Sequence, residues 1–412
     1  MFSDLNSKDL DRTEDASPRK VYLHEDRYRW VNLFLLWLLY VAFGLISRSV
    51  APLVTPILKD LQLSYAQMGF ILGSWQLTYI GVAILAGTLI DKWGVRKSLM
   101  AGTIVMGLSS VLRYFPRGFG GMLAAVALFG AGGSMISIGI PKAIFLWFKG
   151  RNRGTAVGFS LTGSWTGGIV ALTCTNSLIM PWMAHSWRYT LATYGFFTFT
   201  IALLWWFFVR DTETRAGAEE AGIIKVFYKL IRVRNVQIAL ILGFLFFTIL
   251  HGFSNWLPKI LETSGFSRAL SGIMAAIPLA AGIPALLLIP HLIPAASRGR
   301  CLAVSAFLTI ITLAMSVATS GIPQLIGLAL FGFITSPLLS ILTLILMDTP
   351  EVGTESMGSA VGMFYCASEI GGVTGPLMIG VLKDVTGGFL AGTIFLAVLC
   401  LVIAILTVFL KT

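Results

Sequence analysis

The chain has 412 residues, of which 56% are hydrophobic and only 12% are charged, against about 25% charged in a typical soluble protein. This composition excludes an ordinary soluble enzyme, a disordered chain and a coiled coil, and it predicts a protein that spans the membrane several times. The net charge is +11, but the basic residues lie in short segments between apolar runs, which favours membrane topology over nucleic-acid binding.

A helix needs about 20 apolar residues to cross a bilayer, and the chain offers twelve such segments. The predicted spans are 31–57, 67–90, 96–113, 119–147, 154–178, 188–209, 236–261, 268–291, 300–319, 323–347, 357–381 and 387–410. We therefore predict an all-α membrane protein with twelve transmembrane helices.

An internal repeat indicates two equivalent halves. Residues 154–170 and 358–374 are identical at seven of 17 positions, at an offset of 204. Span five then corresponds to span eleven in the same orientation, which predicts two pseudo-symmetric six-helix bundles. The predicted parts are a flexible cytoplasmic tail (1–29), an N-terminal bundle (30–209), a cytoplasmic linker (210–235) and a C-terminal bundle (236–412).

Lys and Arg set the expected orientation in the cell membrane. With the N-terminus inside, the cytoplasmic segments hold 21 of these residues and the external loops hold 7. The positive-inside rule therefore places both termini in the cytoplasm. The four cysteines show no metal-binding or disulfide spacing, and we expect no metal and no cofactor.

Residues 87–97 read GTLIDKWGVRK and fit the pattern G-x-x-x-D-[RK]-x-G-x-[RK]-[RK]. A glycine at position 94 permits a tight turn, and the carboxylate at position 91 suits the positive N-terminus of a neighbouring helix. The motif resembles the signature loop of the major facilitator superfamily. That resemblance implies a loop that latches the two halves, with Asp91 facing the start of span eleven near Gly358. The expected gating residues are Gly87, Asp91, Lys92, Gly94, Arg96 and Lys97.

Two further segments are similar to the organic-anion branches of that superfamily, which comprise oxalate, monocarboxylate and cyanate-type transporters. They are 141–158 (PKAIFLWFKGRNRGTAVG) and 255–261 (NWLPKIL). The chain lacks the mid-span arginines and the span-five Gly-Pro pair that are typical of drug antiporters and nitrate carriers. The resemblance also implies that spans one, four, seven and ten line a central cavity.

Charge inside a membrane is costly, so it marks candidate functional residues. Arg48 lies in span one and shares a helical face with Tyr40 and Gly44, and we predict Arg48 and Tyr40 as substrate contacts. Its guanidinium can hold a carboxylate through two hydrogen bonds, although it could instead reach the outer surface. Lys142, in span four, is a second candidate for substrate contact, with extension to the cytoplasmic surface as the alternative.

Polar groups in other spans complete the predicted site. His251 and Asn255 lie one turn apart in span seven, and Trp75, Gln76 and Tyr79 occupy one turn of span two. Of these we predict Trp75, Tyr79, His251 and Asn255 as substrate contacts. In span ten, the hydroxyl side chains could line a cavity or bond to their own backbone. They are Thr335, Ser336, Ser340 and Thr343.

Glu369 is the only acidic residue within a predicted span. Burial would favour its neutral form, and reversible protonation would suit proton coupling, with Tyr365 one turn earlier as a hydrogen-bond donor. The alternatives are a structural protonated acid or an ion pair with Arg48 or Lys142. Its equivalent in the repeat is Trp165, so the acid breaks the pseudo-symmetry.

The sequence predicts a monomeric secondary transporter for a small organic anion, with a monocarboxylate as the narrower candidate, coupled to protons. An alternative is an amine transporter in which Glu369, Trp75, Tyr79 and Trp165 form an aromatic cage. A non-transporting receptor is a third reading, although the chain has no long polar output segment. No HExxH, GxSxG or P-loop motif occurs, so we do not expect an enzyme.

Overall fold

The computed structural model describes residues 19–148, 151–209 and 223–410, and every regular element in these ranges is a helix. The helices in chain order are α1 (Arg19–Arg48), η1 (Ala51–Leu53), α2 (Val54–Leu61), α3 (Tyr65–Leu112), α4 (Phe119–Trp147), α5 (Arg151–Cys174), η2 (Thr175–Ile179), α6 (Met180–Trp182), α7 (Trp187–Phe208), α8 (Ile223–Leu230), α9 (Arg234–Thr263), α10 (Arg268–Leu292), η3 (Ala295–Ser297), α11 (Arg298–Ala318), α12 (Ile322–Thr335), α13 (Leu338–Met347), α14 (Gly353–Thr386) and α15 (Leu390–Thr407). Most of the predicted tail (1–18) and much of the predicted linker (210–222) lie outside the described residues.

Ten of the helical segments in the described residues are long and apolar enough to cross a membrane. The other two predicted spans, 67–90 and 154–178, do form helices, as the first part of α3 and as α5. Their composition is more polar because they carry Gly, Ser, Thr and Gln at positions that face other helices. The all-helical prediction is therefore confirmed for the described residues, and α3 and α5, which contain these two spans, pack against α14 and α10.

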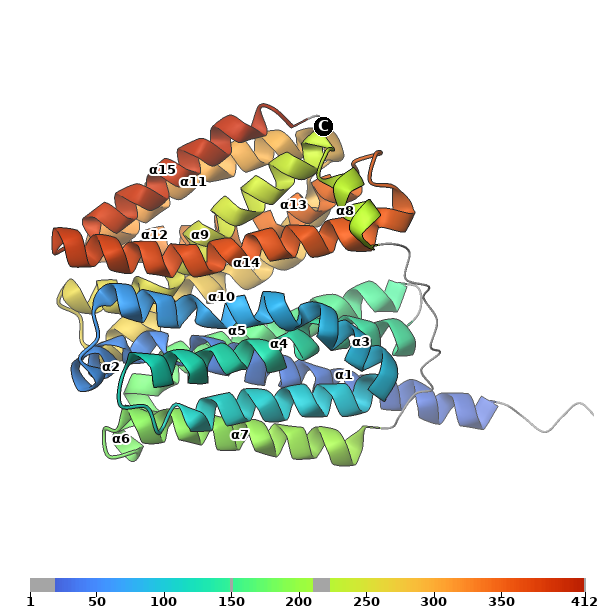
Figure 1. Cartoon of the computed structure of the whole chain (residues 1–412), viewed down its shortest axis with the longest axis horizontal. Coiled ribbons are helices and arrows are strands. Elements are labelled where there is room, and N and C mark those ends of the chain that lie inside the picture. Colours follow the sequence, from blue (N-terminus) through green and yellow to red (C-terminus); the bar gives the residue numbers. More distant parts are fainter. Residues whose placement is uncertain (1–18, 149–150, 210–222, 411–412) are drawn as a thin grey trace, which may run out of the picture.

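The helices form two bundles that lie against each other (Figure 1). The N-terminal half, α1–α7, is drawn in blue to green, and the C-terminal half, α8–α15, is drawn in yellow-green to red. The halves meet where α3 packs on α14 and where α5 packs on α10.

The sequence repeat has a physical counterpart in the packing of glycines. Gly167 in α5 approaches the backbone of α1, where an added Cβ would collide with the carbonyl oxygen of Val41. Its repeat equivalent, Gly371 in α14, approaches α9, where a Cβ would collide with the carbonyl oxygen of Phe244. Close approach of this kind needs a small residue in both helix pairs. The two halves therefore use the same helix pair in the same way.

This packing leads to a prediction about stability. Gly371→Ala should lower the free energy of unfolding by about 1–3 kcal/mol, because the added methyl forces α14 away from α9. Gly81→Ala is the matched control, since a Cβ at Gly81 meets nothing within 4 Å. Thermal unfolding of the detergent-solubilised protein should show a lower midpoint for the first variant only. Equal midpoints would show that α14 and α9 can separate without cost.

Local sequence signals explain where several helices begin and bend. Ser64 caps α3, and its side chain and that of Gln67 form a reciprocal capping box. Gly94 interrupts α3 with φ of 80°, a backbone conformation that favours glycine, so the predicted turn at this position is confirmed. The predicted span 323–347 is divided into α12 and α13, and Pro337 lies at the break because it has no backbone N–H to continue the helix.

The two ends of the molecule are named here by an acidic residue at each. The Asp91 end holds the start of α1, the break at Gly94 and the end of α15, and lies on the right in Figure 1. The Asp384 end holds the start of α3 and the end of α14, and lies on the left.

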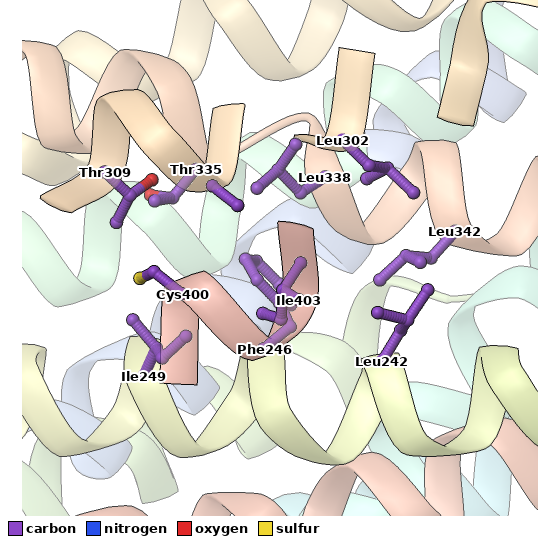
Figure 2. Close-up of a pocket in the computed structure, with 11 residues that line it drawn as sticks. Leu242, Phe246, Ile249, Leu302, Thr309, Thr335, Leu338, Leu342, Cys400 and Ile403 are labelled. Carbon is purple, nitrogen blue, oxygen red and sulfur yellow. The ribbon is translucent and has the colours of Figure 1, made fainter. Parts of the chain in front are cut away.

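A small cavity of about 20 Å³ lies inside the C-terminal half, between α9, α11, α12, α13 and α15 (Figure 2). Its lining is apolar apart from Thr309 and Thr335, whose hydroxyls donate to carbonyl oxygens of their own helices. Ser336 and Thr343 bond to their own backbone in the same way. This cavity is therefore a packing void, and the polar side chains of the predicted span ten are largely satisfied locally.

Candidate functional site

The first feature of the site is a hydrogen bond that joins the two halves. Arg48, at the end of α1, donates from Nη1 to Oδ1 of Asn255 in α9, at 3.3 Å. The predicted face of α1 is confirmed, because Tyr40, Gly44 and Arg48 all face α5, where they meet Gly163, Ser164 and Gly168. The small residues of α5 let α1 approach closely, so that Arg48 lies at the boundary between the halves.

A second hydrogen bond between the halves lies one helical turn away. Gln76 Nε2 in α3 lies 3.2 Å from His251 Nδ1 in α9. An amide nitrogen can only donate, so Nδ1 must accept and the imidazole proton must lie on Nε2. Gly372 in α14 leaves room for this amide, because a Cβ there would lie 2.8 Å from Gln76 Nε2. Trp75 packs edge-on against the same imidazole, with ring centroids 6.2 Å apart.

Glu369 forms the third level of the site. It lies in α14 with an exposed fraction of 7%, and its Oε2 atom has no hydrogen-bond partner. The titratable groups that interact electrostatically with it are Tyr79 of α3 and Tyr365 and Cys366 of its own helix. Within the described residues no cation pairs with it, so the alternative of an ion pair with Arg48 or Lys142 is not what the structure shows.

These three levels follow one another along the molecule. On α9, His251 precedes Asn255 by four residues, which is a rise of about 6 Å toward the Asp384 end. On α3 and α14, Tyr79 and Glu369 each lie three residues from Gln76 and Gly372, on the side of the Asp91 end. The order from the Asp384 end is therefore Arg48 with Asn255, then Gln76 with His251, then Tyr79 with Glu369.

Three buried polar atoms at these levels have no hydrogen-bond partner. They are Asn255 Nδ2, Gln76 Oε1 and Glu369 Oε2, and their residues are exposed by only 3%, 0% and 7%. An unsatisfied buried polar group costs about 1–3 kcal/mol, so such groups are uncommon in native proteins and call for an explanation. Their position between two halves, next to Arg48, points to a site that a polar ligand completes.

Lys142 lies elsewhere than predicted for a substrate contact. Its ammonium pairs with Asp91, at the Asp91 end, where the Asp91 side chain is exposed and that of Lys142 is partly exposed. The expected approach of Asp91 to the start of span eleven is likewise not seen in this structure, where a Cβ on Gly358 would have no neighbour within 4 Å. In this structure the carboxylate pairs with the ammonium of Lys142, on the adjacent helix of the same half.

The other residues of the predicted gating loop divide into two groups. Arg96 donates to the carbonyl oxygen of Trp206 at 2.6 Å and lies over that indole ring, which ties the loop to α7. Lys92 and Lys97 are exposed, and Gly87 has no packing neighbour that a Cβ would meet.

The aromatic cage of the amine alternative is only partly assembled. Tyr79 is a neighbour of Glu369, but Trp165 packs against α10 at Gly282. Trp75 packs against Phe43, Phe129 and His251. These contacts do not favour a cation site built around Glu369.

The Asp384 end carries most of the remaining bonds between the halves. Asp384 accepts hydrogen bonds from the backbone N–H groups of Tyr65 and Ala66, at 3.0 and 2.7 Å, and so caps the start of α3 from the other half. A carboxylate at a helix N-terminus is favourable because it satisfies free N–H groups and complements the helix dipole. Thr55 also donates to Glu262 at 2.5 Å, which joins α2 to α9.

Removal of this cap should loosen the Asp384 end. Asp384→Ala should raise the exchange rate of the Tyr65 and Ala66 amide hydrogens by about 10- to 100-fold, because each loses a charge-assisted hydrogen bond. Hydrogen–deuterium exchange of the 62–70 segment measures this directly. Asp60→Ala is the matched control, since Asp60 pairs with Arg188 inside the N-terminal half at the same end. Unchanged exchange in Asp384→Ala would mean that water replaces the carboxylate without loss.

Gln76 belongs to the site in the structure but is not among the substrate contacts predicted from the sequence. The only sequence feature that points to it is its position in the same helical turn as Trp75 and Tyr79. Its partner His251 is 175 residues away, so no local spacing could connect them.

Known proteins resemble the chain over most of its length. The model of the Major Facilitator Superfamily matches residues 36–376. The hexuronate transporter of Bacillus subtilis (strain 168) is 25% identical over 379 residues, which cover 85% of this chain and 87% of the relative. A Cupriavidus necator protein named "Probable sulfoacetate transporter SauU" is 24% identical over 377 residues, which cover 84% of this chain and 85% of the relative.

A solved structure is similar in fold. It is a bacterial homologue of the human lysosomal transporter Spinster in an inward-facing and unoccupied conformation, with a TM-score of 0.76 and 16% identity. The match covers 92% of this chain and 96% of that chain. Together with the all-helical fold of the described residues and the 87–97 motif, the family match shows that the chain belongs to the Major Facilitator Superfamily.

Proposed function

We propose that the protein is a secondary transporter that moves a small organic anion across the cell membrane by alternating access, with proton coupling through Glu369. The observation that carries this proposal is the position of Arg48, a guanidinium at the boundary of the halves whose partner is a neutral amide. A guanidinium without a carboxylate partner is well suited to bind the carboxylate of a substrate. The hexuronate and sulfoacetate of the relatives' names are small organic anions, which supports the same substrate class.

The distribution of bonds between the halves supports a rocking motion. The cross-half hydrogen bonds run from Gln76 and Arg48 to the Asp384 end, where they involve Thr55, Tyr65, Ala66 and Asn176. A state that opens the Asp384 end must break them, whereas substrate bound at Arg48 can replace the bond to Asn255. Transporters built from two repeats commonly rock about such a central site.

The Asp91 end carries ion pairs inside each half that suit the opposite state. Lys142 pairs with Asp91 in the N-terminal half, and Arg298 pairs with Asp348 in the C-terminal half. The repeat offset of 204 residues places Asp91 close to the position of Arg298, and Lys142 close to that of Asp348. Each acidic residue of one half therefore corresponds to a basic residue of the other. Closure at this end would therefore place opposite charges against each other across the pseudo-two-fold axis. With the orientation expected from Lys and Arg, this end faces the cytoplasm.

Glu369 is proposed to carry the coupled proton. A buried carboxylate without a cation in contact is costly, and none of the described residues supplies one, so burial at this position favours the protonated acid. The groups that face it are Tyr79 from α3 and Tyr365 from α14, with Tyr40 of α1 close to both tyrosines, and His251 is the titratable group of α9 at the next level. A proton on Glu369 can leave when the Asp91 end admits water.

Transport by the purified protein in liposomes tests this proposal. We expect counterflow of a labelled sugar acid into liposomes preloaded with the same unlabelled acid, and faster uptake when the lumen is more alkaline than the medium. The relatives are transporters, which agrees with a carrier rather than an enzyme. Absence of counterflow for every carboxylate and sulfonate tested, with the protein folded, would contradict the proposal.

A further inference from the structure

The buried polar atoms next to Arg48 that have no hydrogen-bond partner require more of a ligand than a negative charge. This inference rests on the proposed function. Asn255 uses its Oδ1 to accept from Arg48, which leaves Nδ2 as a free donor beside the guanidinium. Gln76 uses its Nε2 to donate to His251, which leaves Oε1 as a free acceptor. The site therefore offers one donor and one acceptor in addition to the guanidinium.

A hydroxyl is the group that fits such a pair, because it donates one hydrogen bond and accepts others. Asn255 touches Arg48, so a hydroxyl that accepts from Nδ2 must lie close to the carboxylate that Arg48 holds. A plain carboxylate or sulfonate with an alkyl chain would leave both amide atoms unpaired. It would therefore forfeit the stabilisation that those atoms can supply.

The spacing of the two levels sets the length of the ligand. His251 lies one turn from Asn255 on α9, a rise of about 6 Å. An extended chain advances roughly 1.2 Å per bond, so a second hydroxyl that reaches Gln76 lies about five bonds along the molecule from the first. A two-carbon acid cannot reach both levels, whereas a sugar acid can.

We infer that Gln76, His251 and Asn255 form a hydroxyl-recognising subsite and that the transported anion is a polyhydroxylated carboxylate of about five or six carbons. Arg48 orients the carboxyl group toward the Asp384 end, and the hydroxyls extend toward Glu369. The ligand hydroxyls pair with Asn255 Nδ2 and Gln76 Oε1, the two amide atoms that have no hydrogen-bond partner in this structure.

A series of four anions on the unmodified protein separates charge, length and hydroxyl content. The probes are galacturonate, hexanoate, tartrate and sulfoacetate, with affinity measured by isothermal titration calorimetry. Galacturonate should bind about 100-fold or more tightly than hexanoate, since two buried polar atoms remain unpaired with the latter. Tartrate should fall between them, and sulfoacetate should bind weakly.

The possible outcomes distinguish this inference from the proposed function. Equal affinity for galacturonate and hexanoate, or tightest binding of sulfoacetate, would overturn the hydroxyl subsite while leaving an anion transporter in place. If none of the four anions binds and none supports counterflow, the proposed function fails.

A variant locates the recognition at Gln76. Gln76→Leu should weaken galacturonate binding by about tenfold and leave hexanoate binding unchanged, so that the ratio between them narrows. Gln324→Leu is the matched control, because Gln324 is also buried with an unpartnered Oε1 but bonds to Ser316 inside the C-terminal half. Equal losses for both ligands in Gln76→Leu would assign the residue to packing of the halves instead.

Discussion

Arg48→Ala should abolish measurable binding of the transported anion, with a loss of affinity of at least 100-fold. The reason is that the guanidinium at the boundary of the halves is the group proposed to hold the carboxylate of the substrate, and its partner Asn255 carries no charge. Truncation of one member of a desolvated charge pair commonly costs about 2–5 kcal/mol. Calorimetric titration of the purified protein with a sugar acid measures the loss.

Two further variants show whether geometry or charge matters at this position. Arg48→Lys keeps the charge but loses the planar pair of donors, so we expect an intermediate affinity. Lys142→Ala removes a cation that pairs with Asp91 at the Asp91 end, away from the proposed site. This change should leave the affinity for the anion within about threefold of that of the unmodified protein. A large loss in Lys142→Ala with little loss in Arg48→Ala would reverse the assignment of the two cations.

Glu369→Gln should abolish uptake driven by a pH gradient but spare counterflow. The amide imitates the protonated acid and keeps the shape of the side chain, so the anion still binds and the halves still rock. It cannot release a proton, so an alkaline lumen no longer accelerates net uptake. The two measurements, gradient-driven uptake and counterflow in the same liposomes, separate coupling from binding.

A suitable control removes a carboxylate that has a partner. Asp348 pairs with Arg298 at the Asp91 end, and Asp348→Asn should change the transport rate without removing its dependence on the pH gradient. If Glu369→Gln lost counterflow and gradient-driven uptake to the same extent, Glu369 would be a binding or structural group and not the proton carrier.

Periodicity predicted the candidate face of α1 correctly but could not predict what that face contacts. Tyr40, Gly44 and Arg48 share a face because a helix repeats every 3.6 residues. The contact of this face with α5, and the reach of Arg48 to Asn255, depend on how closely glycines let the two helices approach. A sequence pattern shows on which face of one helix a side chain lies. A hydrogen bond between two helices also depends on how each helix is rotated about its axis and how closely the two helices pack.

The charged residues show the same limit. Hydropathy identifies Glu369 as an intramembrane acid, but only the structure shows that no cation among the described residues pairs with it. Lys142 was recognised as an intramembrane cation, but its partner is 51 residues away in the motif loop. Spacing in sequence carries no information about such pairs.

The all-helical membrane architecture, the repeat that relates the halves and the break at Gly94 can be predicted from the chain alone, because they follow from hydrophobic length, local identity and the backbone freedom of glycine. The contacts of Gln76 with His251 and of Arg48 with Asn255, and the lack of hydrogen-bond partners at three buried polar atoms between the halves, are visible only in the folded protein. Those contacts join groups separated by 175 and 207 residues. They arise from the packing of one bundle on the other, which no local pattern encodes.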